Sequence, residues 1–310
     1  MSPTNPAVEA IITKVQSVYG RWNRDTTVVQ MRADWETLFC AKGQAAVDEV
    51  MADGVRCQWI SAPGVRSDLV VMYFHGGGFQ VGSLTSHQEL MAEISAATGA
   101  RVLGVDYRLA PEHTYPAAHD DAWTAYSWLM AQGVSAHQVA LAGDSAGGGL
   151  ALSLLLRLKS QAEPLPAATW TMSAWTDLTA SGSSYQTRSA LDPIHQRPMI
   201  VAMARNYLRA LGDPSDALLS PLLATLDQLK GLPPLLLQVG ERETVVSDSE
   251  DFVEKAKRAG VAAELQVWPA MIHVFQQFPS ELDDARHAIE AGAQFLTAQF
   301  DAAPYRKTQS

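Results

Sequence analysis

The sequence predicts an α/β protein built on a mostly parallel sheet that is flanked by helices. Short apolar runs of strand length alternate with amphipathic segments of helical length from about residue 69 to about residue 299. This alternation is typical of a parallel sheet that is covered on both faces. Before it, two runs of alternating polarity flank Asp53-Gly54, which is the strongest short signal for a β-hairpin. The hairpin should add antiparallel strands at one edge of the sheet.

The composition is that of a globular protein with a sizeable core. Of the 310 residues, 47% are apolar and 18% are charged. Because α/β folds of this length often form one unit, we expect a single domain over 1–310. The net charge of −10 argues against nucleic acid as a partner. No apolar stretch is long enough for a membrane span, and no signal-peptide pattern follows Met1, so a cytoplasmic protein is expected.

The two cysteines, Cys40 and Cys57, have neither metal-ligand nor redox spacing. Two thiols in a chain of this length are typical of a reducing compartment, and a single disulfide is the alternative. No motif for a metal or an organic cofactor is present, so the sequence predicts a protein that works without either.

The strands and helices are predicted in a regular order. Two hairpin strands come first, at 46–52 and 55–61, and a buried strand at 69–74 follows them. The alternation continues with helix 85–98, strand 101–105, helix 119–131, strand 138–142, helix 146–160, strand 167–173, strand 235–239, helix 247–259, strand 262–268 and helix 282–299. Residues 175–230 interrupt it. An insertion after the carboxyl end of a strand lies over the ligand-binding edge of such a sheet, so residues from about 180 to 215 should belong to a cap.

Residues 7 to about 42 are predicted to be helical and peripheral. An apolar stripe recurs there at helical spacing and consists of Val28, Met31, Trp35, Leu38 and Phe39. Such a stripe either packs into the core or covers an active site as a lid, and the sequence leaves both alternatives open. We expect residues from about 1 to 45 to complete the helical cap.

A nucleophile is predicted at Ser145. Gly143-Asp144-Ser145-Ala146-Gly147 fits G-x-S-x-G and lies between an apolar strand and a helix-forming segment. In this context the motif is a nucleophile elbow, a tight turn that lifts the serine hydroxyl clear of the sheet. Small residues around the turn let the neighbouring backbone come close.

A serine needs a base and an orienting acid to act as a nucleophile. Of the eight histidines, only His75 and His273 lie just beyond the ends of predicted strands. We assign the base to His273, which precedes the last helix and follows the serine in the order of an α/β-hydrolase. The other six histidines, His195 among them, are expected to be structural or exposed. The acid is assigned to Glu243, four residues beyond a strand end, with Asp248 as the alternative.

The segment His75-Gly76-Gly77-Gly78 supplies the third requirement. The tetrahedral intermediate of acyl transfer carries an oxyanion, which preorganised N–H groups stabilise best. Consecutive glycines leave such amides uncovered, so the oxyanion hole is assigned to Gly77, Gly78 and Ala146. A phosphate-binding loop would instead need a Lys and a Ser or Thr close behind, and that pattern is absent. His75 is expected to orient the loop.

Five segments together resemble the hormone-sensitive-lipase-like carboxylesterases (bacterial family IV) of the α/β-hydrolase fold. They read HGGGF (75–79), DYRLAPEHTYPAAHDD (106–121), GDSAGGG (143–149), LPPLLLQVG (232–240) and IHVF (272–275). The resemblance implies a serine esterase for short- to medium-chain acyl esters, with an N-terminal cap and a triad of Ser145, His273 and an acid. It also implies a homodimer that forms through the strand near 262–268.

The chain departs from that family at the acid. The family usually has Asp-Pro-Leu, whereas this chain has Glu243-Thr244-Val245. Glutamate occurs in a subgroup that this chain resembles and that includes monoterpene ε-lactone hydrolases. Within the DYRLAPE block, we expect Asp106, Arg108 and Glu112 to form a buried charge network that supports the elbow.

The pocket should be apolar and suited to esters or lactones of small molecules. Its expected lining consists of Phe79, Ile272 and Val274 beside the site and Met31, Trp35, Met203 and Tyr207 from the cap. A lactone hydrolase is the alternative within the same chemistry. A receptor on the esterase scaffold is the alternative from another class, and the presence of both Ser145 and His273 argues against it.

Overall fold

The computed structural model describes residues 5–39 and 45–302, and within these ranges eight strands form one sheet. The strands are β1 (Ala46–Ala52), β2 (Val55–Ser61), β3 (Arg66–Phe74), β4 (Ala100–Val105), β5 (Val139–Asp144), β6 (Ala168–Met172), β7 (Leu235–Gly240) and β8 (Ala263–Trp268). Their order is β1-β2-β4-β3-β5-β6-β7-β8, and the pairs from β4 to β8 are parallel. β1 and β2 form the antiparallel hairpin at one edge. The predicted sheet is confirmed.

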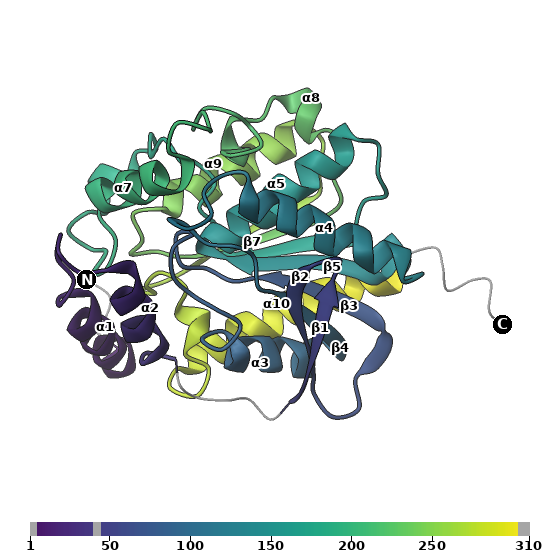
Figure 1. The fold of residues 1–310 in the computed structure, drawn as a ribbon, viewed down its shortest axis with the longest axis horizontal. Helices are drawn as coiled ribbons and strands as arrows, with labels where there is room; N and C mark the ends of the chain where they lie inside the picture. Colours follow the sequence, from purple (N-terminus) through teal and green to yellow (C-terminus); the bar gives the residue numbers. More distant parts are fainter. Residues whose placement is uncertain (1–4, 40–44, 303–310) are drawn as a thin grey trace.

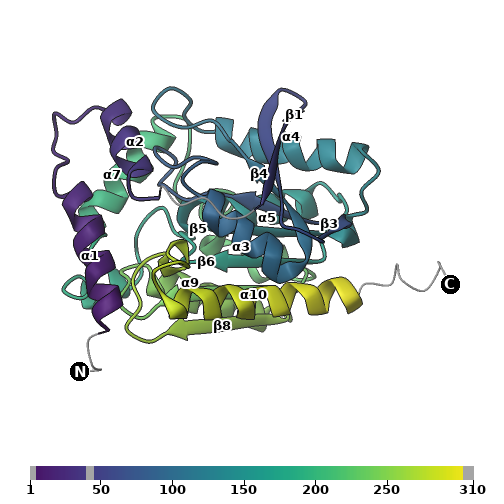
Figure 2. The same ribbon diagram turned by 90° about the horizontal axis from the view of Figure 1, so that it is seen from below.

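Helices cover both faces of this sheet (Figures 1 and 2). α4 (Ala117–Ala131), α5 (Ser145–Ser160) and α9 (Val246–Arg258) lie on one face, and α3 (Gln88–Thr98) and α10 (Asp283–Ala302) lie on the other. Each face has its own core, because one hydrophobic cluster includes residues of α4, α5 and α9 and a second includes residues of α3 and α10. The short elements between them are η1 (Ala136–Gln138), α6 (Ser184–Thr187), η2 (Pro221–Leu223), α8 (Leu226–Leu229) and η3 (Phe275–Gln277).

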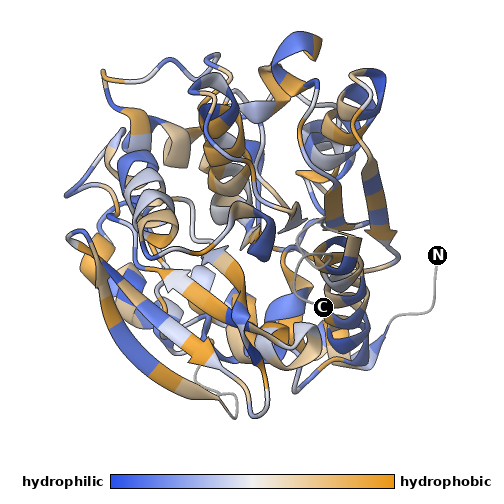
Figure 3. Cartoon of the chain, turned by 90° about the vertical axis from the view of Figure 1, so that its right-hand side faces the viewer, coloured by the Kyte–Doolittle hydropathy of each residue, from blue (hydrophilic) through white to orange (hydrophobic). Residues whose placement is uncertain are grey.

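The central strands are apolar throughout because both of their faces are buried. In β5, Val139 and Leu141 belong to the core beneath α4 and α5, whereas Ala140 and Ala142 belong to the core on the side of α10. The outer helices instead alternate between hydrophobic and hydrophilic residues along the chain (Figure 3). Each of them buries only one side against the sheet.

The N-terminal segment, which we expected to be helical over residues 7 to about 42, forms two helices. α1 (Pro6–Tyr19) begins after Asn5, whose side chain accepts a hydrogen bond from the Ala7 amide, and α2 (Val28–Glu36) is capped in the same way by Thr27. Apolar residues of α1 pack against the region of Phe275 and Phe278. None of the residues of α2, Val28–Glu36, is fully buried. This helix is therefore not part of the core.

The remaining large helix of the cap region is α7 (Arg197–Leu208). α1, α2 and α7 lie together at one end of the molecule, away from the C-terminal end of α10 (Figures 1 and 2).

In the part of the chain that the structure describes, no helix is both long and apolar enough to cross a bilayer. Cys57 is buried and free, whereas Cys40 lies outside the described residues.

The charged residues of the DYRLAPE block do not form the buried network that we expected. Asp106 pairs with Arg56, Arg108 pairs with Asp121, and Glu112 pairs with Arg32. The side chains of Arg108 and Glu112 are 48% and 46% exposed. Each charge therefore has a separate, partly hydrated partner, and the expectation of one buried network was wrong because the loop runs over the surface.

Candidate active site

Ser145 stands at a strained turn between β5 and α5. Its φ is 50°, a left-handed conformation that costs a non-glycine residue free energy and is found at nucleophile elbows. The backbone around it is crowded. A Cβ atom at Gly147 would lie 2.0 Å from the carbonyl oxygen of Phe74, and one at Gly143 would lie 2.6 Å from that of Gly147. Glycine is therefore required at both positions of the motif.

Two loops at the same edge of the sheet bring an imidazole and a carboxylate to this serine. His273 follows β8, and its Nε2 lies 2.9 Å from Ser145 Oγ. Glu243 follows β7, and its Oε2 lies 2.7 Å from His273 Nδ1. Burial disfavours the imidazolium form of His273, but the adjacent Glu243 carboxylate outweighs this effect and raises the pKa of His273 above its ordinary value.

The Glu243 carboxylate is itself fixed by neighbouring groups. Its Oε1 accepts hydrogen bonds from the Ser173 hydroxyl, at 2.7 Å, and from the Gly240 amide. The Ser173 hydroxyl also accepts a hydrogen bond of 3.0 Å from the Val274 amide. Ser173 thus ties the loop that carries the acid to the loop that carries His273.

Asp248, the alternative acid, faces elsewhere. Its Oδ2 accepts hydrogen bonds from the amides of Thr176 and Asp177, both at 3.1 Å, and from the Tyr185 hydroxyl. Burial raises the pKa of Asp248 well above its usual range, and the nearby Asp177 carboxylate adds to this rise. These contacts give Asp248 a structural role in holding the loop after β6.

Gly77 and Gly78 border the same cavity as Ser145. Both have positive φ, of 117° and 61°, and a Cβ atom at Gly77 would lie 2.1 Å from the Val81 carbonyl oxygen. Ala146 is the second residue of α5, so its amide is among the N–H groups that have no partner within the helix. The three amides of the expected oxyanion hole therefore come from the loop after β3 and from the helix N-terminus.

His75 lies beneath that loop and supports it. Its ring stacks on Tyr107 at a centroid distance of 4.4 Å, and the Tyr107 hydroxyl donates a hydrogen bond of 2.6 Å to the His75 carbonyl. The Asp144 carboxylate accepts a hydrogen bond of 2.9 Å from the Gly76 amide. Burial lowers the pKa of His75 to about 3, so this imidazole is neutral at neutral pH.

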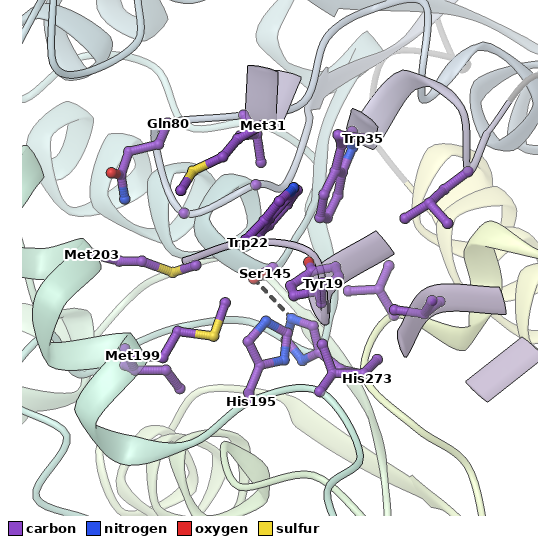
Figure 4. A pocket seen from close by; sticks show the side chains of 18 of the residues that line it. Tyr19, Trp22, Met31, Trp35, Gln80, Ser145, His195, Met199, Met203 and His273 are labelled. Atoms are coloured by element: carbon purple, nitrogen blue, oxygen red, sulfur yellow. Dashed lines mark hydrogen bonds between the residues drawn. The ribbon is translucent and has the colours of Figure 1, made fainter. Parts of the chain in front are cut away.

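A cavity of about 760 Å³ opens above Ser145 and His273. The two N-terminal helices, the segment between them, α7 and the loop before it contribute most of its wall. Labelled in Figure 4 are Tyr19, Trp22, Met31, Trp35, Gln80, His195, Met199 and Met203, which surround the hydrogen bond between Ser145 and His273. The lining is predominantly aromatic and aliphatic, which suits an apolar ligand.

Comparison with known proteins places the chain in a family. The profile described as the alpha/beta hydrolase fold matches residues 71–277. An acetyl-hydrolase of Streptomyces hygroscopicus is 38% identical over 80% of this chain and 82% of its own length, and an esterase of Acinetobacter venetianus is 36% identical over 84% and 85%. A solved structure of an esterase from the bacterial hormone-sensitive lipase family is 39% identical, covers 96% of this chain and 99% of its own, and superposes with a TM-score of 0.91.

The chain belongs to the hormone-sensitive-lipase-like α/β hydrolases. In this hydrolase, four of the residues that we expected in the pocket line the cavity, namely Met31, Trp35, Met203 and Val274.

The expectation was wrong for Phe79, Tyr207 and Ile272, because their side chains are buried in the hydrophobic core. Phe79 and Tyr207 stack on each other at a centroid distance of 4.0 Å, and both are buried. The Tyr207 hydroxyl forms a hydrogen bond with His119 at 2.7 Å. Ile272 packs in the cluster that joins α1 to α10. None of the three is among the described residues of the cavity wall.

Sequence reasoning also missed three residues of this site. Tyr19 and Trp22 line the cavity, but they lie at the end of α1 and just beyond it, outside the apolar stripe of α2. His195 was expected to be structural or exposed, yet it lines the cavity, and its ring lies 4.3 Å from that of His273. It belongs to an irregular segment, so no periodic pattern could have placed it there.

Proposed function

We propose that the protein is a serine carboxylesterase that hydrolyses short- to medium-chain acyl esters through an acyl-enzyme intermediate. The observation that carries the proposal is the hydrogen-bonded chain from Ser145 Oγ through His273 to Glu243, which opens into an apolar cavity. Membership of the family makes the protein a carboxylic ester hydrolase. Beyond that activity, we propose a role for each residue of the site and a range of substrates.

The first half of the reaction transfers the acyl group to the serine. Ser145 Oγ attacks the ester carbonyl carbon while His273 Nε2 takes the hydroxyl proton. The tetrahedral intermediate then expels the alcohol, to which His273 returns that proton. The ester C–O bond is broken, and an ester bond to Ser145 replaces it.

The second half releases the acid. A water molecule takes the place of the alcohol, loses a proton to His273 and attacks the acyl carbon. The bond to Ser145 breaks, and the serine regains its proton from His273. Glu243 holds His273 with Nε2 toward the serine and stabilises the imidazolium that forms twice in each cycle.

The amides of Gly77, Gly78 and Ala146 stabilise both tetrahedral intermediates. Negative charge develops on the carbonyl oxygen in each of them, and fixed N–H donors stabilise that charge without reorganising. The positive φ angles of the two glycines support this role, because they turn the peptide units of the loop in a way that a residue with a side chain resists.

A panel of p-nitrophenyl esters of increasing acyl length tests the proposal. We expect hydrolysis of the short and medium esters, and loss of nearly all activity in Ser145→Ala. A fluorophosphonate probe should add its mass to a peptide that contains Ser145. An unlabelled serine would favour the receptor alternative, in which the scaffold binds a small molecule without hydrolysing it.

Lactone hydrolysis is the second candidate function. Glu243-Thr244-Val245, which departs from the usual Asp-Pro-Leu, favours it through the subgroup that the sequence resembles. A ring ester needs the same attack, proton transfers and oxyanion hole, and only the shape of the pocket differs. An ε-lactone that is hydrolysed faster than every open-chain ester of the panel would make this the principal activity.

A further inference from the structure

His195 is a buried polar residue in the wall of an otherwise mostly apolar cavity. It lies in the segment that leads into α7 and is 9% exposed. Figure 4 shows its ring beside that of His273, below Ser145. His195 has no role in the reaction proposed above.

The imidazole of His195 has no hydrogen-bond partner among the residues that the structure describes. Its Nδ1 is buried without one, and its side chain forms no hydrogen bond with any of these residues. Buried polar atoms in native proteins are nearly always hydrogen-bonded, and an exception calls for an explanation. The other ring nitrogen, Nε2, also has no hydrogen-bond partner among these residues, and it is not one of the buried unpaired atoms. Nε2 is therefore the nitrogen that a ligand in the cavity can reach.

The position of His195 is fixed relative to the proposed catalytic residues. Asp192 Oδ1 accepts hydrogen bonds of 2.9 Å from the amides of Ile194 and His195. Asp192 Oδ2 accepts hydrogen bonds from the amide and the hydroxyl of Thr244, at 2.8 and 3.0 Å. Because Thr244 directly follows Glu243, the buried Asp192 carboxylate links the loop of His195 to the loop of Glu243.

The contact between the two imidazoles places His195 on one side of the reaction. The rings meet edge to face at a centroid distance of 4.3 Å. His273 Nε2 is the group that protonates the departing alcohol in a serine hydrolase. The alcohol portion of the ester must therefore leave past His273, in the part of the cavity that His195 borders.

We propose that His195 is a specificity residue that binds the alcohol portion of the substrate through a hydrogen bond to a second oxygen on that alcohol. The proposal rests on the proposed esterase function and narrows its substrates to esters of diols, polyols or alkoxy alcohols. The acyl portion is expected to contact the apolar wall. One polar contact in an apolar pocket fixes the orientation of a ligand and rejects analogues that lack the matching group.

The charge state of His195 is compatible with this role. Burial lowers the pKa of His195 to about 3, and the positive charge that His273 can carry lowers it further. The imidazole is therefore neutral at neutral pH and offers one N–H donor and one nitrogen acceptor. A neutral ring also avoids repulsion when His273 becomes an imidazolium.

A competition between 2-hydroxyethyl butanoate and propyl butanoate tests the proposal. The two esters have equal numbers of heavy atoms and the same acyl group, and they differ in one terminal hydroxyl. Their rate ratio in alkaline hydrolysis without enzyme corrects for intrinsic reactivity. We expect the wild-type enzyme to prefer the hydroxyethyl ester by about tenfold in corrected kcat/KM, the worth of one ordinary hydrogen bond.

Two variants of His195 and one neighbouring variant identify the source of the preference. His195→Phe keeps a planar ring and should lose the preference while it still cleaves propyl butanoate. His195→Asn keeps a hydrogen-bonding group and should retain part of it. Met199→Leu changes an apolar neighbour in the same wall and should retain the wild-type ratio.

The outcomes separate the two proposals. If both esters are cleaved at their intrinsic ratio, or if His195→Phe keeps the wild-type preference, the role of His195 is refuted and the esterase function stands. If neither ester is cleaved while the fluorophosphonate fails to label Ser145, the proposed function fails and the role of His195 fails with it.

Discussion

Glu243 and Asp248 show how two buried carboxylates five residues apart can have different roles. Glu243 Oε2 accepts the hydrogen bond of His273 Nδ1, whereas Asp248 binds backbone amides after β6. The sequence could restrict the acid to this short stretch because the carboxyl end of β7 must face the same edge as Ser145. It could not decide between them by spacing alone, since a shift of a few residues at the start of α9 exchanges their positions.

Glu243→Gln should lower kcat by several orders of magnitude. The amide cannot stabilise the imidazolium and can favour the wrong tautomer of His273, a change that costs about 10⁴ in a serine protease. Asp248→Asn should lower kcat by less than about tenfold, because the Asp248 carboxylate binds the Thr176 and Asp177 amides and the Tyr185 hydroxyl instead of His273. Steady-state kinetics with p-nitrophenyl butyrate and a thermal melt of each variant check this. The reverse ranking in folded variants would transfer the role of the acid to Asp248.

The pH dependence of kcat/KM should report the ionisation of His273. Only the neutral imidazole accepts the serine proton, so activity is lost as pH falls through the pKa of His273 and rises to a plateau above it. Because Glu243 raises that pKa, the midpoint should lie above about 6.5, the ordinary value for histidine. The residual activity of Glu243→Gln should have a lower midpoint. A profile without a step between pH 5 and pH 9 would contradict the assignment of His273 as the base.

At the scale of elements, polar contacts at the edge of the cap anchor α2, which has no fully buried residue of its own. Arg32 Nε donates a hydrogen bond of 2.8 Å to the Gln80 carbonyl, and its guanidinium also binds the Ala110 carbonyl and both oxygens of Glu112. Gln80 lies two residues beyond Gly78. One side chain of α2 therefore fixes both the helix and the loop that carries two of the proposed oxyanion donors.

Arg32→Met should lower kcat/KM by roughly tenfold, the effect of losing about 1.5 kcal/mol of charge-assisted hydrogen bonding to the loop. Kinetics with a short acyl ester measure this. Arg56→Met is the control, because Arg56 of the outer hairpin also forms charge-assisted pairs, with the carboxylates of Glu49 and Asp106. The control should keep the wild-type kcat/KM. Equal kinetic effects of the two variants would show that Arg32 acts only through general stability.

At the scale of the whole molecule, the sequence predicted the sheet more fully than the cap. The central strands could be predicted because burial on both faces makes them apolar throughout. Val139 packs into the core on one face of the sheet, and Ala140 packs into the core on the other. The cap has no such regularity. Trp22 and His195 come from irregular segments, and Phe79 turns away from the cavity to stack on Tyr207. These placements depend on which segments pack together, and that information lies in tertiary contacts.

The free edge of β8 makes a testable site for a homodimer. β8 is the last strand of the sheet. The carbonyls of Ala262 and Trp268 accept hydrogen bonds from the amides of Leu235 and Glu241, so the even-numbered residues of this segment direct their backbone groups toward β7. In a parallel ladder, the residues at odd positions of β8 then direct their backbone groups outward. Val267 is one of them, and it is 39% exposed. No strand among the described residues pairs with this edge, and an edge of this kind can join the same edge of a second copy.

We therefore expect a dimer in analytical ultracentrifugation and a monomer for Val267→Pro. Proline removes the outward N–H of Val267 but leaves the bonds between β7 and β8 in place, because it is tolerated at an edge strand where the amide faces solvent. Val267→Ala keeps that N–H and should remain dimeric, which separates backbone pairing from side-chain contact. Both variants should keep esterase activity, since no residue of β8 is among the described residues of the cavity wall. A dimer that survives Val267→Pro would place the interface on another surface.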